Sequence, residues 1–143
     1  MLVLDVNILI YAFDTSSKDH QICYDWLTKT LQTDQVRAPN VVLSGFLRIV
    51  TNTKIYPNAD TRSAWDFVES LEAHPNFEIL PSSVQHWLTF KQLCQSMNMS
   101  GNDFSDAFIA AFALEYNATL VSADKGFSRF GNLNFFNPVI KKQ

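Results

Sequence analysis

Short apolar runs and longer amphipathic segments alternate along the chain. The first run, residues 1–4, is rich in Val and Leu, which is typical of a buried strand. Val6–Phe13 follows it with the apolar spacing of a helix. Similar apolar runs recur toward the C-terminus. The further predicted strands are Gln35–Ala38, Phe77–Leu80, Ala118–Ser122 and Leu133–Phe136.

Amphipathic segments separate these strands. Asn40 and Thr61 have side chains that cap helix N-termini, and residues 53–60, with a proline, indicate a loop. Because strands alternate with helices, we expect an α/β fold: a three-layer α/β/α sandwich around a central, mainly parallel sheet. Residues 141–143 form a polar tail. The further predicted helices are Ser17–Thr33, Val41–Asn52, Thr61–His74, Val84–Met97 and Phe108–Tyr116, the last preceded by Asp103–Ala107.

Composition indicates one folded domain over residues 1–143, since 47% of the residues are hydrophobic and only 17% are charged. The net charge of −3 argues against non-specific binding to nucleic acid through a basic surface. Cys23 and Cys94 lack metal-ligand spacing and are predicted to be reduced. No signal peptide or membrane span is predicted, so we expect a cytoplasmic protein.

Acidic residues follow two of the predicted strands. Asp5 comes directly after the first strand, and Asp124 comes just after the fourth. Parallel strands share their carboxyl edge, where ligands of open α/β sheets bind, so these two side chains should lie side by side. Asp106, in the first turn of a predicted helix, is placed to face the same crevice.

Three neighbouring carboxylates repel one another unless a proton, a base or a cation compensates them. Mg²⁺ or Mn²⁺ fits best, because these hard ions prefer carboxylate and water oxygens. Such an ion polarises a phosphoryl oxygen and activates a bound water. The three acids therefore predict a metal-assisted hydrolysis of phosphodiesters.

Each acid also has a simpler explanation. Asp5 alone could cap the helix beginning at Val6, and Asp103 with Asp106 has the spacing of an N-cap and its third helical residue. Asp124 could be a turn residue before Lys125. A second set of candidates lies on the polar stripe of the helix over 41–52. These residues are Ser44, Arg48 and Thr51, of which Arg48 is a candidate contact for RNA phosphate.

Three stretches of the chain resemble the PIN-domain ribonucleases, more narrowly the VapC-type toxins of bacterial toxin–antitoxin pairs. They read LDVNILIYAF, VVLSGFLRIVTN and GNDFSDAFIAAFALEYNATLVSADKGFSRFGNL. The resemblance implies a PIN-like α/β/α sandwich, a homodimer, and Mg²⁺- or Mn²⁺-dependent endonucleolytic cleavage of RNA. It also implies inhibition by a VapB-like antitoxin.

Matched to the family's motifs, the metal-binding and catalytic acids are Asp5, Asp106 and Asp124, with Asn7 and Ser122 in support. The family commonly has a further Glu where this chain has Gly45. Asp103 or water could fill that gap. A glycine within a helix costs about 1 kcal/mol relative to alanine, so we expect another helix or the substrate to approach the backbone there.

Three other functions are compatible with a strand followed by an acid at the start of the chain, and the sequence argues against two of them. A phosphatase of the haloacid dehalogenase type also begins with a strand and an Asp, but Asn7 stands where its second acid is needed. A receiver-like phosphoacceptor would need an acid pair before the first helix, which the chain lacks. A PIN-fold module that binds antitoxin or RNA without cleavage stays open, since Gly45 removes one acid.

Overall fold

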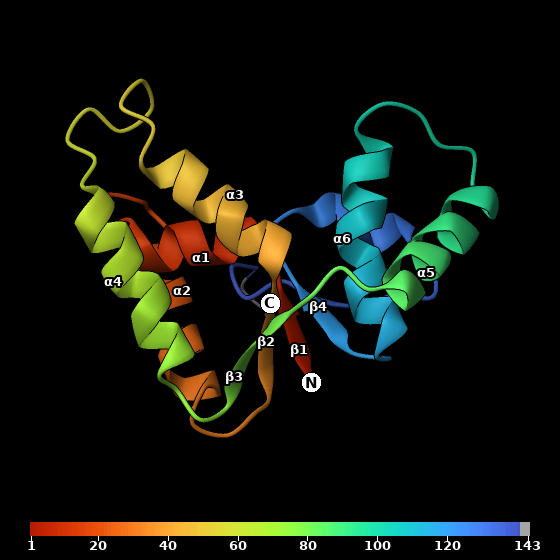
Figure 1. Ribbon diagram of the computed structural model, residues 1–143, viewed down its shortest axis with the longest axis horizontal. Helices are drawn as coiled ribbons and strands as arrows, with labels where there is room; N and C mark the ends of the chain where they lie inside the picture. Colours follow the sequence, from red (N-terminus) through yellow and green to blue (C-terminus); the bar gives the residue numbers. More distant parts are fainter. Residues whose placement is uncertain (141–143) are drawn as a thin grey trace.

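A five-stranded, wholly parallel sheet forms the centre of the computed structural model, which describes residues 1–140 (Figure 1). The strand order is β3-β2-β1-β4-β5, so the first strand lies in the middle. This confirms the predicted α/β class. The predicted tail, 141–143, lies outside the described residues. The strands are β1 (Leu2–Leu4), β2 (Val36–Pro39), β3 (Phe77–Leu80), β4 (Thr119–Val121) and β5 (Asn134–Phe136).

Six α-helices and a short 3-10 helix connect the strands within residues 1–140. None of these helices has the length and apolar character needed to cross a bilayer. Cys23 is buried, Cys94 is partly buried, and both are free thiols. The helices are α1 (Val6–Phe13), α2 (His20–Thr30), α3 (Asn40–Val50), α4 (Thr61–Glu72), α5 (Val84–Gln95), α6 (Asp103–Glu115) and η1 (Lys125–Arg129).

Three helix starts differ from the predictions, and at two of them a carboxylate accepts a hydrogen bond from a backbone N–H group. The N-cap of α4 is Asp60, not Thr61: its carboxylate accepts from the Arg62 N–H at 3.0 Å. Asp103 is the first residue of α6 rather than its cap, and its carboxylate accepts from the Ser100 N–H at 3.2 Å. Helix α2 begins three residues later than predicted.

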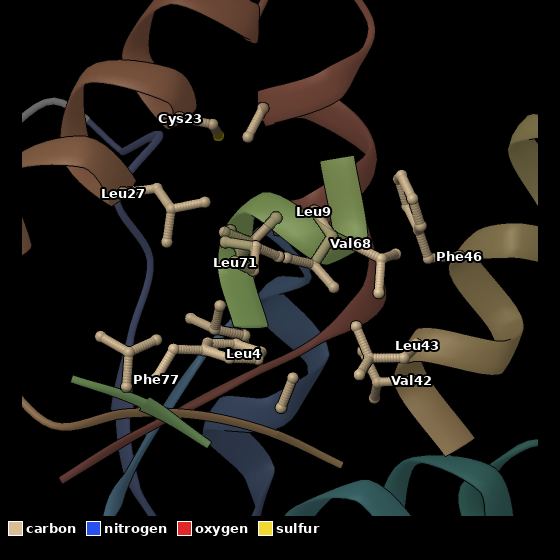
Figure 2. Packing of buried hydrophobic residues seen from close by; sticks show 14 of the residues in the cluster. Leu4, Leu9, Cys23, Leu27, Val42, Leu43, Phe46, Val68, Leu71 and Phe77 are labelled. Atoms are coloured by element: carbon tan, nitrogen blue, oxygen red, sulfur yellow. The ribbon is translucent and has the colours of Figure 1, made fainter. Parts of the chain in front are cut away.

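Two hydrophobic clusters cover the two faces of the sheet. Alternate residues of β1 serve both, because Leu4 packs in one cluster and Val3 in the other. The first cluster joins the sheet to α1, α2, α3 and α4, and Figure 2 shows Leu4, Leu9 and Phe46 among its side chains. The second joins the sheet to α5, α6 and η1. Helices therefore enclose both faces and leave the carboxyl edge to carry polar residues.

Candidate active site

The three predicted acids meet at the carboxyl edge of the sheet. Strands β1 and β4 are parallel neighbours, and the Asp5 N–H donates to the Val121 carbonyl at 2.9 Å. Asp5 follows β1, Asp124 follows β4, and Asp106 projects from α6. All three line one cleft of about 670 Å³. Topology thus brings Asp5 to the same cleft as two acids that lie more than one hundred residues later in the sequence.

The walls of this acidic cleft are mostly apolar. Helix α6 contributes aromatic side chains to them, and α3 contributes Gly45 and the charged Arg48 beside its apolar residues. A second hollow of about 600 Å³ lies beside the α3–α4 loop, but no predicted site residue lines it. We therefore place the candidate site in the acidic cleft. Its apolar lining residues are Val6, Val41, Val42, Ile49, Phe90, Phe104, Phe108, Ile109 and Phe127.

Asp5 is the most buried of the three acids, with 8% of its surface exposed. Its Oδ1 accepts from the Val6 N–H at 2.7 Å, and its Oδ2 accepts from the Ser122 hydroxyl at 2.7 Å. Burial raises the pKa of Asp5, these hydrogen bonds oppose the rise, and the Asp106 and Asp124 carboxylates add to it. Negative charge in the cleft is therefore only partly compensated.

Asn7 and Ser122 form a polar network behind Asp5. Ser122 is fully buried, and its Oγ accepts from the Asn7 side-chain amide at 3.1 Å and from the Asp124 N–H at 3.0 Å. The Asn7 Oδ1 accepts from the Ala123 N–H at 3.1 Å. The network fixes the orientation of the Asp5 carboxylate and the chain that leads into Asp124. Both residues support the site, and only Asn7 lines the cleft.

Asp5 and Asp124 also act as helix caps, the simpler role that the sequence allowed for an acid at such a position. Asp5 is the N-cap of α1, and Asp124 caps η1 by accepting from the Gly126 N–H at 2.8 Å. Each of these caps engages one carboxylate oxygen, and although the Asp5 Oδ2 also accepts from Ser122, a carboxylate oxygen can accept more than one hydrogen bond. Capping therefore leaves acceptor capacity that can face the cleft.

Arg129 lies outside the cleft lining but contacts the site through Asp106, and the sequence did not single it out. Its Nη2 donates to the Asp106 Oδ2 at 2.8 Å and to the Asp103 Oδ1 at 3.1 Å. The hydrogen bond with Asp106 raises the pKa of Arg129. The sequence contained one hint of this contact: Arg129 is a basic residue three positions after Gly126, in the turn that follows Asp124.

The remaining candidates differ in position. Arg48 lines the cleft, whereas Ser44 is exposed and lies outside its lining. Asp103 also lies outside the lining, beside Arg129. A Cβ atom at Gly45 would meet only Val6 Cγ2, at 3.9 Å. Another helix or the substrate was expected to approach this glycine: α1 does so through Val6 at ordinary contact distance, and the remaining space beside it belongs to the cleft.

The cleft suits a hard cation that keeps part of its water shell. Within residues 1–140, no group of three or more His, Cys, Asp or Glu side chains is placed to hold a metal ion by itself. The acids offer oxygen ligands, which Mg²⁺ and Mn²⁺ prefer, and Mg²⁺ usually retains several waters in protein sites. The acids lining the cleft, with their partly compensated charge, fit such an ion held partly through water.

Comparisons with known proteins agree with this fold. The PIN domain family model matches residues 2–133. A VapC ribonuclease of Mycobacterium bovis is 38% identical, covering 97% of this chain and 96% of the relative. Ribonuclease VapC25 of Mycobacterium tuberculosis is 32% identical, covering 98% of this chain and 100% of the relative. VapBC2 from Rickettsia felis, solved bound to a promoter DNA fragment, has a chain that matches with a TM-score of 0.71 and 25% identity, covering 95% of this chain and 97% of that one.

Proposed function

We propose a function from one premise: this chain belongs to the PIN domain family and, within it, to the group of the VapC ribonucleases. The proposed function is that of a Mg²⁺- or Mn²⁺-dependent endoribonuclease that acts as the toxin of a toxin–antitoxin pair. The observation that carries it is the single cleft lined by Asp5, Asp106 and Asp124. These acids are the proposed metal-binding and catalytic residues.

The proposed chemistry divides between the acids and the residues behind them. A bound Mg²⁺ or Mn²⁺ would polarise the scissile phosphoryl oxygen and lower the pKa of an attacking water. Asp5, Asp106 and Asp124 would hold this ion directly or through water. Ser122 and Asn7 keep Asp5 oriented through their hydrogen bonds.

Features of the cleft support a single-stranded RNA substrate. Arg48 lines the cleft and can contact a phosphate, which matters in a chain of net charge −3. Phe104 is 44% exposed at the same cleft, where its ring can stack on an unpaired base. We therefore propose that this protein cleaves RNA in loops or unpaired segments rather than in stems.

Two protein partners belong to the proposal: a VapB-like antitoxin and a second copy of this chain. The match to a chain of the VapBC2 complex supports the antitoxin. Helix α5 exposes Val84, Trp87 and Leu88, an apolar surface of the kind that interfaces cover. Co-expression with the product of an adjacent antitoxin gene, followed by mass measurement of the complex, tests both partners.

Gly45 favours one alternative function, a PIN-fold module that binds antitoxin or RNA without cleaving it. The deciding experiment incubates the purified chain with structured RNAs in Mn²⁺ and in EDTA, beside Asp5→Asn and Asp106→Asn. We expect cleavage by the wild type in Mn²⁺ alone and none by either variant. RNA binding without cleavage would favour the alternative, and equal, metal-independent cleavage by all three proteins would refute the metal-dependent mechanism.

A further inference from the structure

The guanidinium group of Arg129 is held on several sides at the edge of the cleft. Its Nη1 donates to the Gly126 carbonyl, and its Nη2 contacts both Asp103 and Asp106. The guanidinium carbon lies 4.5 Å from the centre of the Phe130 ring, in cation–π geometry. Although 34% of the side chain is exposed, these contacts give it one defined position.

Gly126 provides the room that this position requires. A Cβ atom there would lie 2.9 Å from the Arg129 Nη1 and 3.1 Å from the Asp124 Oδ1. The backbone of Gly126 is not in the left-handed region, so its conformation does not require glycine. A Cβ atom would instead crowd both charged side chains, so the present position of the Arg129 guanidinium uses the space that glycine leaves. The turn between Asp124 and Arg129 is therefore built to bring a cation next to the acids.

The acids of the cleft differ in how their charge is compensated. Asp106 forms an ion pair with Arg129, whereas residues 1–140 contain no ion pair that involves Asp5 or Asp124. Arg48 lines the same cleft without pairing with an acid in the described part of the chain. Asp106 is thus the proposed metal ligand that already has a counter-cation.

We propose that Arg129 is a positioning residue that serves as the built-in counter-cation of Asp106, and that a divalent ion entering the cleft must share this carboxylate with it. This inference rests on the proposed metal site. Two cations on the one Asp106 carboxylate divide its single negative charge, and the two positive charges repel each other. Arg129 therefore weakens metal binding while it stabilises the metal-free protein.

The test is calorimetric titration of the full-length, metal-free chain with MnCl₂. We expect Arg129→Gln to bind Mn²⁺ about three- to tenfold more tightly than the wild type, the range for loss of a partly exposed, charge-assisted pair. Arg129→Lys keeps the charge and should stay within about twofold of the wild type. In EDTA, Arg129→Gln should melt at a lower temperature, because Asp103 and Asp106 lose their counter-cation.

Controls separate this inference from the function on which it rests. Arg62→Gln removes an exposed arginine that pairs with Asp66 on α4, at 3.4 Å, and should leave Mn²⁺ affinity unchanged. Arg129→Met, which keeps an apolar stem over Phe130, replaces the Gln variant if that variant fails to fold. Unchanged or weaker Mn²⁺ binding without Arg129 would overturn the inference, as would an increase that Arg129→Lys shares. Absence of Mn²⁺ binding to the wild type and every variant would instead refute the proposed metal site.

Discussion

Asp5 combines a structural and a proposed chemical role in one side chain. It caps α1 through the Val6 N–H, yet it is nearly buried beside two other carboxylates. A cap on a solvent-exposed helix end would avoid that electrostatic cost. Retaining a charge under these conditions is typical of a site that trades stability for function.

Asp5→Asn is therefore expected to stabilise the metal-free protein at neutral pH by about 1 kcal/mol. Burial and the neighbouring carboxylates raise the pKa of Asp5 above its ordinary value of 3.8, so the folded state holds this proton more tightly than the unfolded chain does. The wild type accordingly loses stability relative to the variant as the pH rises through the raised pKa. Thermal melting in EDTA at several pH values measures the difference, which should shrink toward the acid end.

Asp66→Asn is the matched control for this charge removal. Asp66 lies on the exposed side of α4 in a surface pair with Arg62, outside the cleft, so its substitution should give no comparable gain. If Asp5→Asn proved less stable than the wild type near neutral pH, the hydrogen bonds from Ser122 and Val6 would outweigh burial and repulsion.

Ser122→Ala is expected to destabilise the protein by about 1–3 kcal/mol, because it leaves buried polar groups without partners. Ser122 donates to Asp5 and accepts from the Asp124 N–H, so its loss also frees both acids to move. Mn²⁺ binding and RNA cleavage should weaken together. Urea unfolding and calorimetry measure the two effects, with Ser128→Ala on the exposed surface of η1 as the control. Unaltered Mn²⁺ affinity would show that Ser122 does not orient the acids.

Helix α3 carries a glycine that its packing does not require. Gly45 lies in the middle of the helix, and a Cβ atom there would make only an ordinary contact with Val6. The resemblance to the PIN family places an acid at this position, where the structure has open cleft. Gly45 therefore lowers the helical stability of α3 and leaves space in the cleft beside the three acids.

Gly45→Ala is expected to raise the free energy of unfolding by about 0.5–1 kcal/mol, since alanine favours the helix and meets no obstacle. Gly101→Ala provides the contrast. Gly101 has open space around it but a φ of +55°, so alanine there should destabilise the protein. Urea unfolding of both variants checks the pair. Destabilisation by Gly45→Ala would mean that α3 packs more tightly than the structure shows.

At the scale of elements, the sequence predicted the order and type of the helices and strands, because apolar periodicity differs between the two. Their ends were less predictable. Asp60 outcompetes Thr61 as the cap of α4 because its carboxylate is positioned to accept from the Arg62 N–H. Such a choice depends on the conformation of the preceding loop, which periodicity does not encode.

The site was predictable only where it follows from topology. Asp5 and Asp124 could be placed side by side because parallel strands share a carboxyl edge. Asp106 could be placed near them because it lies in the first turn of a helix that begins at that edge. Arg129 could not be placed, since its contact with Asp106 spans 23 residues and depends on how the turn after Asp124 folds. Nor could the sequence show that Ser44 and Asp103 lie outside the cleft lining.

At the scale of the whole molecule, the central position of β1 organises the fold and the cleft. Its neighbours β2 and β4 place α3 and the Asp124 turn on opposite sides of Asp5. With a net charge of −3, the protein lacks the general attraction for RNA that a basic surface would give. Binding and cleavage should therefore depend together on a cation held in the cleft.

The central claim is tested most directly by measuring RNA cleavage and Mn²⁺ binding in the same sample across a range of Mn²⁺ concentrations. The account predicts no cleavage in EDTA, a rate that rises with occupancy of the Mn²⁺ site, and loss of both binding and cleavage in Asp106→Asn. Cleavage at an undiminished rate in EDTA, or full cleavage by Asp106→Asn without bound Mn²⁺, would contradict it.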